Sequence, residues 1–229
     1  MPNWVYCDLT VIGSPGDLDA VARQVGAPYE RPYIRTDFDK ETGEWSPKII
    51  TETYDEPVFA FWNIVRPSDD IMDEYLTVHS DSKRRRGWVP EGAWSVLLNE
   101  PSTGDLSNHW YDWNIRNWGV KWDAGDVEAN TFGDDLSYRF STAWSIPHEA
   151  MLALSAQFVG VSFFLEYEEE QGWGGENQYE AGSYTCVNEW DIPDSHADNT
   201  LRDRPCVCEW EPDDKEYWYD DCPREEVAA

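Results

Sequence analysis

The sequence predicts an α+β domain in which an antiparallel sheet carries two helices on one face. Three observations support this fold class. Alternating apolar and polar residues open the chain, two amphipathic helical patterns each follow a strand pattern, and the strong elements run strand, helix, strand, then strand, helix, strand. Hydrophobic residues make up 41% of the 229 residues, which is enough to form a core.

The first half of the pattern is a strand followed by a helix. Residues 4–12 alternate in the way expected of a half-buried strand. Asp17 is the predicted N-cap of a helix that Gly26 and Pro28 end. The apolar run 58–65 is the next predicted strand.

The second half repeats this order. Residues 126–132 and 136–144 form a predicted strand pair, and Ser145 is the predicted N-cap of the following helix. Residues 161–167 alternate again, and a last strand passes through Tyr184 after a glycine-rich turn at 172–175. The two halves together predict a ferredoxin-like sandwich with large insertions. That name refers to topology and implies no iron–sulfur cluster.

We expect one ferredoxin-like domain at 1–190, with insertions at about 27–56 and 68–108, and an acidic aromatic tail at 191–229. The first insertion is a long loop or a small hairpin. The second contains a possible short helix at 69–76 and the basic cluster Lys83–Arg86, interpreted as a solvated loop or an internal ion-pair partner. The tail is either disordered or laid over the domain.

The net charge restricts the possible partners. Asp and Glu number 46 against 17 Lys and Arg, which gives a formal charge of −29. Charge of this size repels nucleic-acid phosphates and anionic membranes, and no apolar run is long enough to span a bilayer. We therefore expect no direct nucleic-acid binding and no membrane insertion. Three interpretations of the acidity remain: adaptation to high salt, an acidic surface that binds a basic partner as a nucleic-acid mimic, and cation binding.

A tryptophan-rich block spans 110–123. Trp110, Trp113 and Trp118 have helical spacing, with Gly119 as the expected helix end, which favours a core role for their rings. Lys121 is expected to pair with Asp112 or Asp123. The alternative is a stacking or peptide-binding platform on the open face of the sheet, to which Tyr6, Phe164 or Trp144 would add rings.

Motifs for catalysis are absent from the sequence, and we predict no catalytic, cofactor-binding or metal-ligating residue. Cys206 and Cys208, with Cys222, Cys186 and His196, offer the donors of a zinc site, but a single intervening residue is short for a zinc knuckle. Whether these cysteines bind metal stays open. Five cysteines and no secretory segment at the start of the sequence lead us to expect reduced thiols in a cytoplasmic protein.

Four segments have a distinctive pattern: the opening 1–4, Phe61–Val65 followed by Pro67, the block 110–123, and 140–147. Together they resemble the Api92-like proteins of phages and plasmids, also described as the YubB ferredoxin-like domain family. The resemblance covers about 1–184 and implies a ferredoxin-like fold in a protein of a mobile element. It implies no activity and no site residue. The tail after Asp191 is expected to lie outside the shared pattern.

These observations predict a protein-binding accessory protein that acts in the host cytoplasm on a basic host protein, with inhibition of a nucleic-acid-binding or defence protein as one mode of action. The alternatives are a metal-dependent enzyme or nucleic-acid processing factor, and an acidic protein adapted to high salt; an enzyme is the less favoured. The predicted partner-binding residues combine acids and rings in the manner of single-stranded nucleic acid: Trp210, Tyr217, Trp218, Tyr219, Asp220 and Asp221. The oligomeric state is not indicated.

Overall fold

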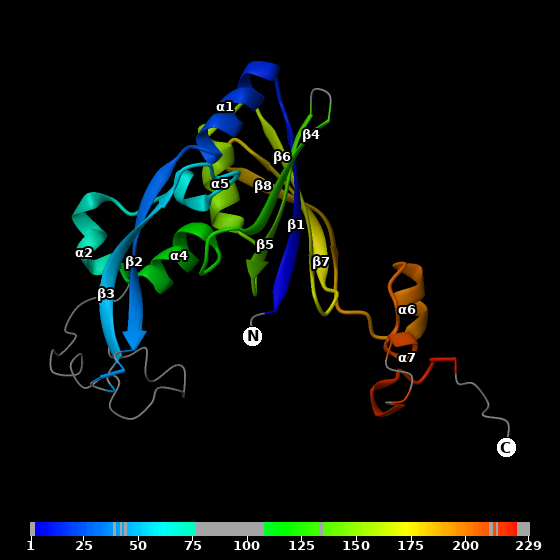
Figure 1. Cartoon of the computed structure of the whole chain (residues 1–229). Helices are drawn as coiled ribbons and strands as arrows, with labels where there is room; N and C mark the ends of the chain where they lie inside the picture. The colour runs from blue at the N-terminus through cyan, green and yellow to red at the C-terminus, as the bar shows by residue number, and fades with distance from the viewer. Residues whose placement is uncertain are drawn as a thin grey trace.

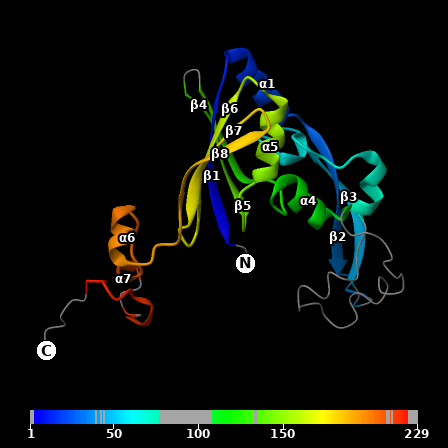
Figure 2. The same cartoon turned by 180° about the vertical axis from the view of Figure 1, so that it is seen from behind.

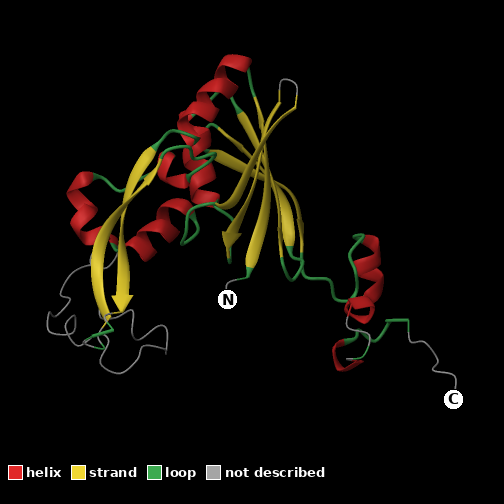
Figure 3. Cartoon of the chain, in the orientation of Figure 1, coloured by secondary structure: helices red, strands yellow, loops and turns green. Residues whose placement is uncertain are grey.

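The computed structural model describes residues 3–38, 40–41, 43, 45–76, 108–132, 135–210, 213 and 215–223 (Figure 1). Its centre is a six-stranded antiparallel sheet with the order β4-β5-β1-β6-β7-β8. The strands are β1 (Trp4–Ile12), β4 (Gly125–Phe132), β5 (Asp135–Ala143), β6 (Ser162–Glu169), β7 (Gly174–Glu180) and β8 (Ser183–Trp190). Helices α1 (Pro15–Val25) and α5 (His148–Gln157) lie on the same face of this sheet (Figure 3).

The predicted ferredoxin-like fold is confirmed. Elements β1, α1, β4, β5, α5 and β6 form the strand, helix, strand, strand, helix, strand core, and their strands are ordered β4-β5-β1-β6. Strands β7 and β8 extend this sheet beyond β6. The central strand β1 pairs antiparallel with both β5 and β6.

The alternation in β1 divides the sheet into two faces. Val5, Cys7, Leu9 and Val11 are at most 1% exposed and belong to the core beneath the helices. The residues between them point to the opposite face, which is largely exposed. Burial of these apolar side chains under α1 and α5 is the main stabilising term for this arrangement.

Both core helices begin at residues other than those predicted. The side chain of Ser14, not Asp17, caps α1 by accepting a hydrogen bond from the backbone N–H of Asp17. The Asp17 carboxylate instead accepts a hydrogen bond from the Ser14 hydroxyl at 2.6 Å. Ser145 does not cap α5, because its hydroxyl donates to the carbonyl of Gly119 at 2.7 Å. Hydroxyl residues near a helix start thus have more than one available backbone partner.

The predicted strand at 58–65 is wrong. This segment contains a short 3-10 helix, η1 (Phe61–Asn63), and Phe59 to Trp62 are buried on all sides. The backbone N–H groups of Phe61 and Trp62 donate to the carboxylate of Asp123, at 2.6 and 3.3 Å, and not to a neighbouring strand. A short apolar run does not distinguish a buried strand from another buried segment.

The first insertion is a hairpin, which confirms one of the two predicted alternatives. Strands β2 (Tyr29–Phe38) and β3 (Trp45–Tyr54) pair antiparallel in a sheet of their own. The expected short helix follows as η2 (Asp69–Ile71) and α2 (Met72–Tyr75). Most of the second insertion, including Lys83–Arg86, lies outside the described residues.

Strand β7 was not predicted, because the sequence around it suggests only a turn. Gly174 and Gly175 lie in the strand, where a Cβ on Gly174 would approach the carbonyl oxygen of Tyr167 to 2.3 Å and the ring of Trp190 to 2.7 Å. The glycines therefore allow neighbouring strands and a tryptophan ring to pack closely. The predicted last strand is present as β8.

The tryptophan-rich block forms helix α4 (Trp110–Trp118), as predicted, and ends at Gly119 in a left-handed conformation with φ of 83°. Trp113 and Trp118 are 4% and 0% exposed, and Trp110 packs against the same core. The core interpretation is therefore confirmed. Among the described residues, no helix is both long enough and apolar enough to cross a bilayer.

Candidate functional site

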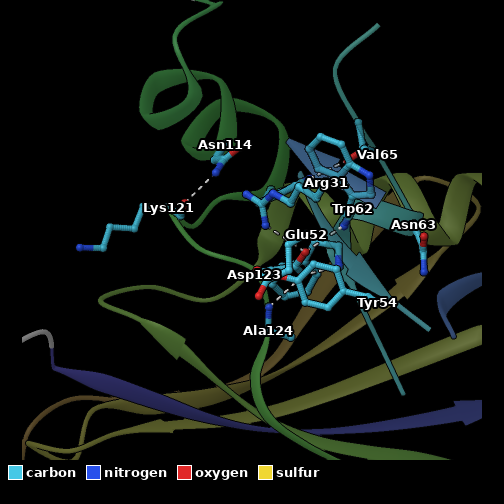
Figure 4. Close-up of polar contacts among 12 residues, drawn as sticks. Arg31, Glu52, Tyr54, Trp62, Asn63, Val65, Asn114, Lys121, Asp123 and Ala124 are labelled. Atoms are coloured by element: carbon cyan, nitrogen blue, oxygen red, sulfur yellow. Dashed lines mark hydrogen bonds and ion pairs between the residues drawn. The ribbon is translucent and has the colours of Figure 1, made fainter. Parts of the chain in front are cut away.

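Charged groups lie between the hairpin and the rest of the domain (Figure 4). Asp123 forms an ion pair with Arg31 of β2 at 3.5 Å and also accepts hydrogen bonds from the backbone N–H groups of Phe61, Trp62 and Ala124. Burial raises the pKa of Asp123, although Arg31 and these donors act to lower it. Its partners are all internal to the fold, and Asp123 therefore has a structural role.

Lys121 does not pair with Asp123, contrary to one of the two predicted pairings. Its ammonium nitrogen lies 3.4 Å from the centroid of the Trp122 ring and 3.6 Å from that of Trp144. Trp122 also neighbours Trp4, with the ring centroids 6.2 Å apart. Cation–π contact with two rings explains how Lys121 can be only 5% exposed.

The open face of the sheet does not assemble the predicted stacking platform. Tyr6 is 54% exposed on β1, but it lies opposite Glu168, whereas Phe164 lies opposite Thr10. Four residues of strand separate the two positions, about 13 Å at the usual rise per residue. Trp144 packs instead with Trp122 at the end of the sheet.

The same open face carries a row of four carboxylates and one arginine across five strands. The cross-strand partners run from Glu128 on β4 through Arg139 on β5, Asp8 on β1 and Glu166 on β6 to Glu176 on β7. Arg139 pairs with Asp8 at 2.8 Å, and both side chains are more than half exposed. Figures 1 and 2 show that no described helix covers this face.

The predicted tail folds on itself instead of lying over the sheet. It contains α6 (His196–Leu201), α7 (Val207–Trp210) and the 3-10 helix η4 (Lys215–Tyr217). In both views α6 and α7 lie beside the sheet at the end of a connecting segment (Figures 1 and 2). The contact with the sheet includes an ion pair between Arg204 and Glu168.

The six predicted partner-binding residues have different environments. Tyr217 is 67% exposed and Asp220 is exposed, so both are accessible to a partner. Trp218 is half-buried with Lys215 over its ring, and the hydroxyl of Tyr219 donates to the carbonyl of Pro193 at 2.7 Å. Both carboxylate oxygens of Asp221 accept backbone hydrogen bonds at the start of α6. The side chain of Trp210 lies outside what the structure describes.

Four side chains with metal-binding donors converge in this segment. His196, Cys206, Cys208 and Cys222 place one donor atom each within 4.8 Å of all the others. The Sγ atoms of Cys206 and Cys222 are 3.4 Å apart, and Cys208 Sγ lies 3.4 Å from Nδ1 of His196. Cys186, which the sequence analysis grouped with them, is exposed on β8 and is not part of the cluster.

The three thiols of this cluster differ in pKa. Burial opposes ionisation of Cys206, but hydrogen bonds from the Cys208 backbone, His196 and Cys222 lower its pKa below the ordinary value. Burial raises the pKa of Cys208 to about 12 and also raises that of Cys222. One thiolate is thus favoured among three crowded sulfurs, since a second negative charge nearby is unfavourable.

The sequence spacing argues against a metal site at these donors, because only one residue separates Cys206 from Cys208. In the structure Cys206 immediately precedes α7 and Cys208 lies in its first turn, while His196 begins α6. The short spacing is accommodated because the other two ligand positions come from distant segments. The concentration of three cysteines and one histidine within 196–222 was the available signal.

Residues 117–203 match the family model described as a ferredoxin-like domain in Api92-like protein. This confirms the resemblance to Api92-like proteins. The matched range runs from the end of α4 through α6, so the Api92-like region extends past Tyr184 and includes residues 191–203 of the tail. The expectation that the shared pattern stops before the tail is corrected accordingly.

One solved structure with the Api92 name is also similar. It is the crystal structure of a protein api92 from Yersinia pseudotuberculosis, with 12% sequence identity and a TM-score of 0.44, and the alignment covers 84% of this chain and 99% of that chain. No curated protein matches the sequence.

Proposed function

We propose that this Api92-like chain is a protein-binding module whose open sheet face receives a basic helical segment of its partner. The observation that carries the proposal is the row of carboxylates across that face. Glu128, Asp8, Glu166 and Glu176 occupy four of five consecutive strand positions, and Arg139 is the single cation in the row.

This row is unfavourable for the isolated domain. Asp8 lies directly opposite Glu166, and Glu166 lies directly opposite Glu176. Like charges at directly opposed positions of an antiparallel pair destabilise it. Cations of a partner placed over these pairs would relieve the repulsion, and a positive partner would also be attracted at long range by the net charge of −29.

The spacing of the acids favours a helix as the partner element. Neighbouring strands lie about 4.8 Å apart, so the carboxylates of Asp8, Glu166 and Glu176 on three adjacent strands repeat at about that distance across the sheet. Lysines or arginines three or four residues apart on a helix have Cβ atoms about 5–6 Å apart. A basic helix laid across the strands can therefore place successive cations opposite successive acids, with exposed Tyr217 and Asp220 as additional contacts.

The proposed partner is a basic host protein, in keeping with the phage and plasmid context that the resemblance implies. Binding of nucleic acid itself is disfavoured by the same charge that attracts a basic protein. A surface that presents ordered carboxylates to a nucleic-acid-binding protein would compete with its phosphate ligand. Inhibition of such a host protein is therefore part of the proposal.

Two labelled peptides test the proposal. Both have the same lysine and alanine content, but one places its lysines along one helix face and the other distributes them around the helix. Fluorescence anisotropy at moderate salt should show at least about tenfold tighter binding of the one-face peptide, which corresponds to about 1.4 kcal/mol. The triple variant Asp8→Asn, Glu166→Gln, Glu176→Gln should lose this preference.

The matched control removes three acids elsewhere. Asp19, Asp55 and Glu56 are exposed and lie outside the sheet, so their amide variants change the net charge by the same amount. This control should retain the preference for the one-face peptide. If both triple variants lost the preference for the one-face peptide equally, binding would depend on net charge and not on the positions of the acids. That result would fit an acidic protein adapted to high salt and would contradict the proposal.

A further inference from the structure

The strongest unassigned feature is the four-residue cluster of His196, Cys206, Cys208 and Cys222. Three chain segments supply its donors: the start of α6, the start of α7 and the segment after η4. Cys206 is 0% exposed and Cys222 is 5% exposed. All five cysteines of the chain are free thiols, so no disulfide links these segments.

The distances match those expected around one tetrahedral ion. With Zn–S bonds of about 2.3 Å and a Zn–N bond of about 2.0–2.1 Å, tetrahedral geometry separates two sulfurs by about 3.8 Å and a sulfur from a nitrogen by about 3.5 Å. The Cys206–Cys222 and Cys208–His196 separations are both 3.4 Å, and all four donor atoms lie within 4.8 Å of one another. A single ion can therefore reach all four donors with small side-chain adjustments.

The fold of the C-terminal segment supplies an independent reason for an ion. Among the described residues of 191–223, the buried side chains are only Pro193, Asn199, Cys206 and Cys222. Leu201 is 86% exposed and contributes little to a core. A segment of this size cannot offset its chain entropy with so little buried apolar surface, and natural segments of this kind depend on a disulfide or a metal.

Neighbouring polar groups hold the ligand-bearing segments in place. Asp221 precedes Cys222, and its carboxylate accepts hydrogen bonds from the backbone N–H groups of His196 and Ala197 at 2.8 and 2.9 Å. This contact joins the ligand segment after η4 to the ligand segment at the start of α6. At the start of α7, the carboxylate of Glu209 accepts a hydrogen bond from the backbone N–H of Cys206 at 3.4 Å. Such contacts orient metal ligands from outside the coordination sphere.

We propose that His196, Cys206, Cys208 and Cys222 bind one Zn²⁺ ion that stabilises the C-terminal segment. Soft thiolates combined with an imidazole select zinc over the hard cations calcium and magnesium. Four protein donors fill a tetrahedral site and leave no position for a water or substrate, so the ion is structural and not catalytic. Binding displaces a proton from each thiol that is protonated before the ion enters.

The first experiment uses the full-length protein after reduction and removal of metal with a chelator. Titration with Zn²⁺ against a competing chromophoric chelator should give one equivalent bound. Titration with Co²⁺ should produce the intense visible absorption of tetrahedral thiolate coordination, which excess Zn²⁺ should abolish. A stoichiometry near zero, or a pale octahedral Co²⁺ spectrum, would overturn the proposal.

Variants then locate the site. Cys206→Ser and Cys222→Ser should each lower the zinc affinity at least about 100-fold, whereas Cys186→Ser, at an exposed cysteine outside the cluster, should leave it unchanged. Proteolysis provides a separate readout: zinc should protect the segment after Trp190 from cleavage in the wild type and in Cys186→Ser, but not in Cys222→Ser. Equal zinc affinity in all three variants would place the ion elsewhere and overturn the assignment.

Discussion

Arg31 of the inserted hairpin forms a partly buried ion pair with Asp123, although 92 residues separate them in the sequence. The guanidinium also lies over the rings of both Trp62 and Trp118, with its central carbon 5.0 and 5.1 Å from their centroids. Its terminal nitrogen donates to the hydroxyl of Tyr75. This one side chain therefore connects the hairpin to η1, α2 and α4, and it positions the first insertion on the domain.

Removal of one member of this pair should be strongly destabilising. Arg31→Met retains much of the packing between the two rings but leaves the Asp123 carboxylate buried without its cation. Asp123→Asn also removes the charge attraction and one acceptor for backbone N–H groups. Each single variant should lose more than about 1 kcal/mol of unfolding free energy in urea, up to the about 3–5 kcal/mol typical of a fully buried pair that loses one partner.

The double variant distinguishes an interacting pair from two independent sites. Arg31→Met with Asp123→Asn should lose clearly less than the sum of the single variants, since neither charge then remains unpaired. Arg35→Met on the same hairpin is the control, because its ion pair with Asp37 is exposed and should contribute little. If the losses of unfolding free energy in Arg31→Met and Asp123→Asn were strictly additive in the double variant, the two residues would not be coupled.

Trp118 should be among the most sensitive positions of the tryptophan-rich block. It is fully buried, and its indole N–H donates to the carbonyl of Val65 at 2.8 Å. Trp118→Ala should therefore cost about 3–5 kcal/mol in denaturant unfolding. Ile115→Ala on the same helix is the matched control; its side chain is 39% exposed, and a loss of about 0.5 kcal/mol is expected. Similar losses at both positions would argue against a core role for this helix face.

The sequence was sufficient to predict those helices and strands that bury one face and expose the other. Strand β1 alternates because one face of the sheet is covered by helices, and α4 has its tryptophans at helical spacing because one side of it enters the core. The segment at 58–65 could not be predicted in the same way. Its central residues Phe59 to Trp62 are buried on all sides, and the backbone partner of Phe61 is the distant carboxylate of Asp123.

The candidate site was partly predictable from composition but not from spacing. Three cysteines and a histidine within 196–222 indicated a possible metal site, whereas the one-residue gap between Cys206 and Cys208 argued against it. The decisive contact is between Asp221 and the start of α6, which joins segments 25 residues apart in the sequence. Sequence patterns do not encode such long-range hydrogen bonds.

Cys7 should make the stability of the domain fall at alkaline pH. Burial raises the pKa of its thiol from 9.0 to about 12, and the nearby charge of Asp8 adds to this, while a hydrogen bond with Thr142 acts in the opposite direction. Because the pKa is raised in the folded state, this contribution to stability is fully present below pH 9. It is lost as pH rises from 9 towards 12.

Unfolding free energies measured between pH 8 and 11 should therefore decline less steeply for Cys7→Ala than for the wild type. The same burial predicts that iodoacetamide at pH 8 modifies exposed Cys186 in the native protein and leaves Cys7 unmodified, as peptide mass analysis would show. Rapid modification of Cys7 under native conditions would contradict its place in the core.

Deletion of residues 191–229 should leave the sheet domain folded. The C-terminal helices lie beside the sheet, and the ion pair between Arg204 and Glu168 that joins them to it is partly exposed (Figure 1). Such a pair contributes at most about 1 kcal/mol, and for a domain of this size that corresponds to about 2–4 °C in Tm. We expect the truncated protein to melt within about 5 °C of the full chain, with the core unchanged. Arg204→Gln in the full chain is the matched control and should reproduce much of that shift. A loss of more than about 10 °C in the truncated protein would instead show that the tail buries apolar surface of the sheet domain.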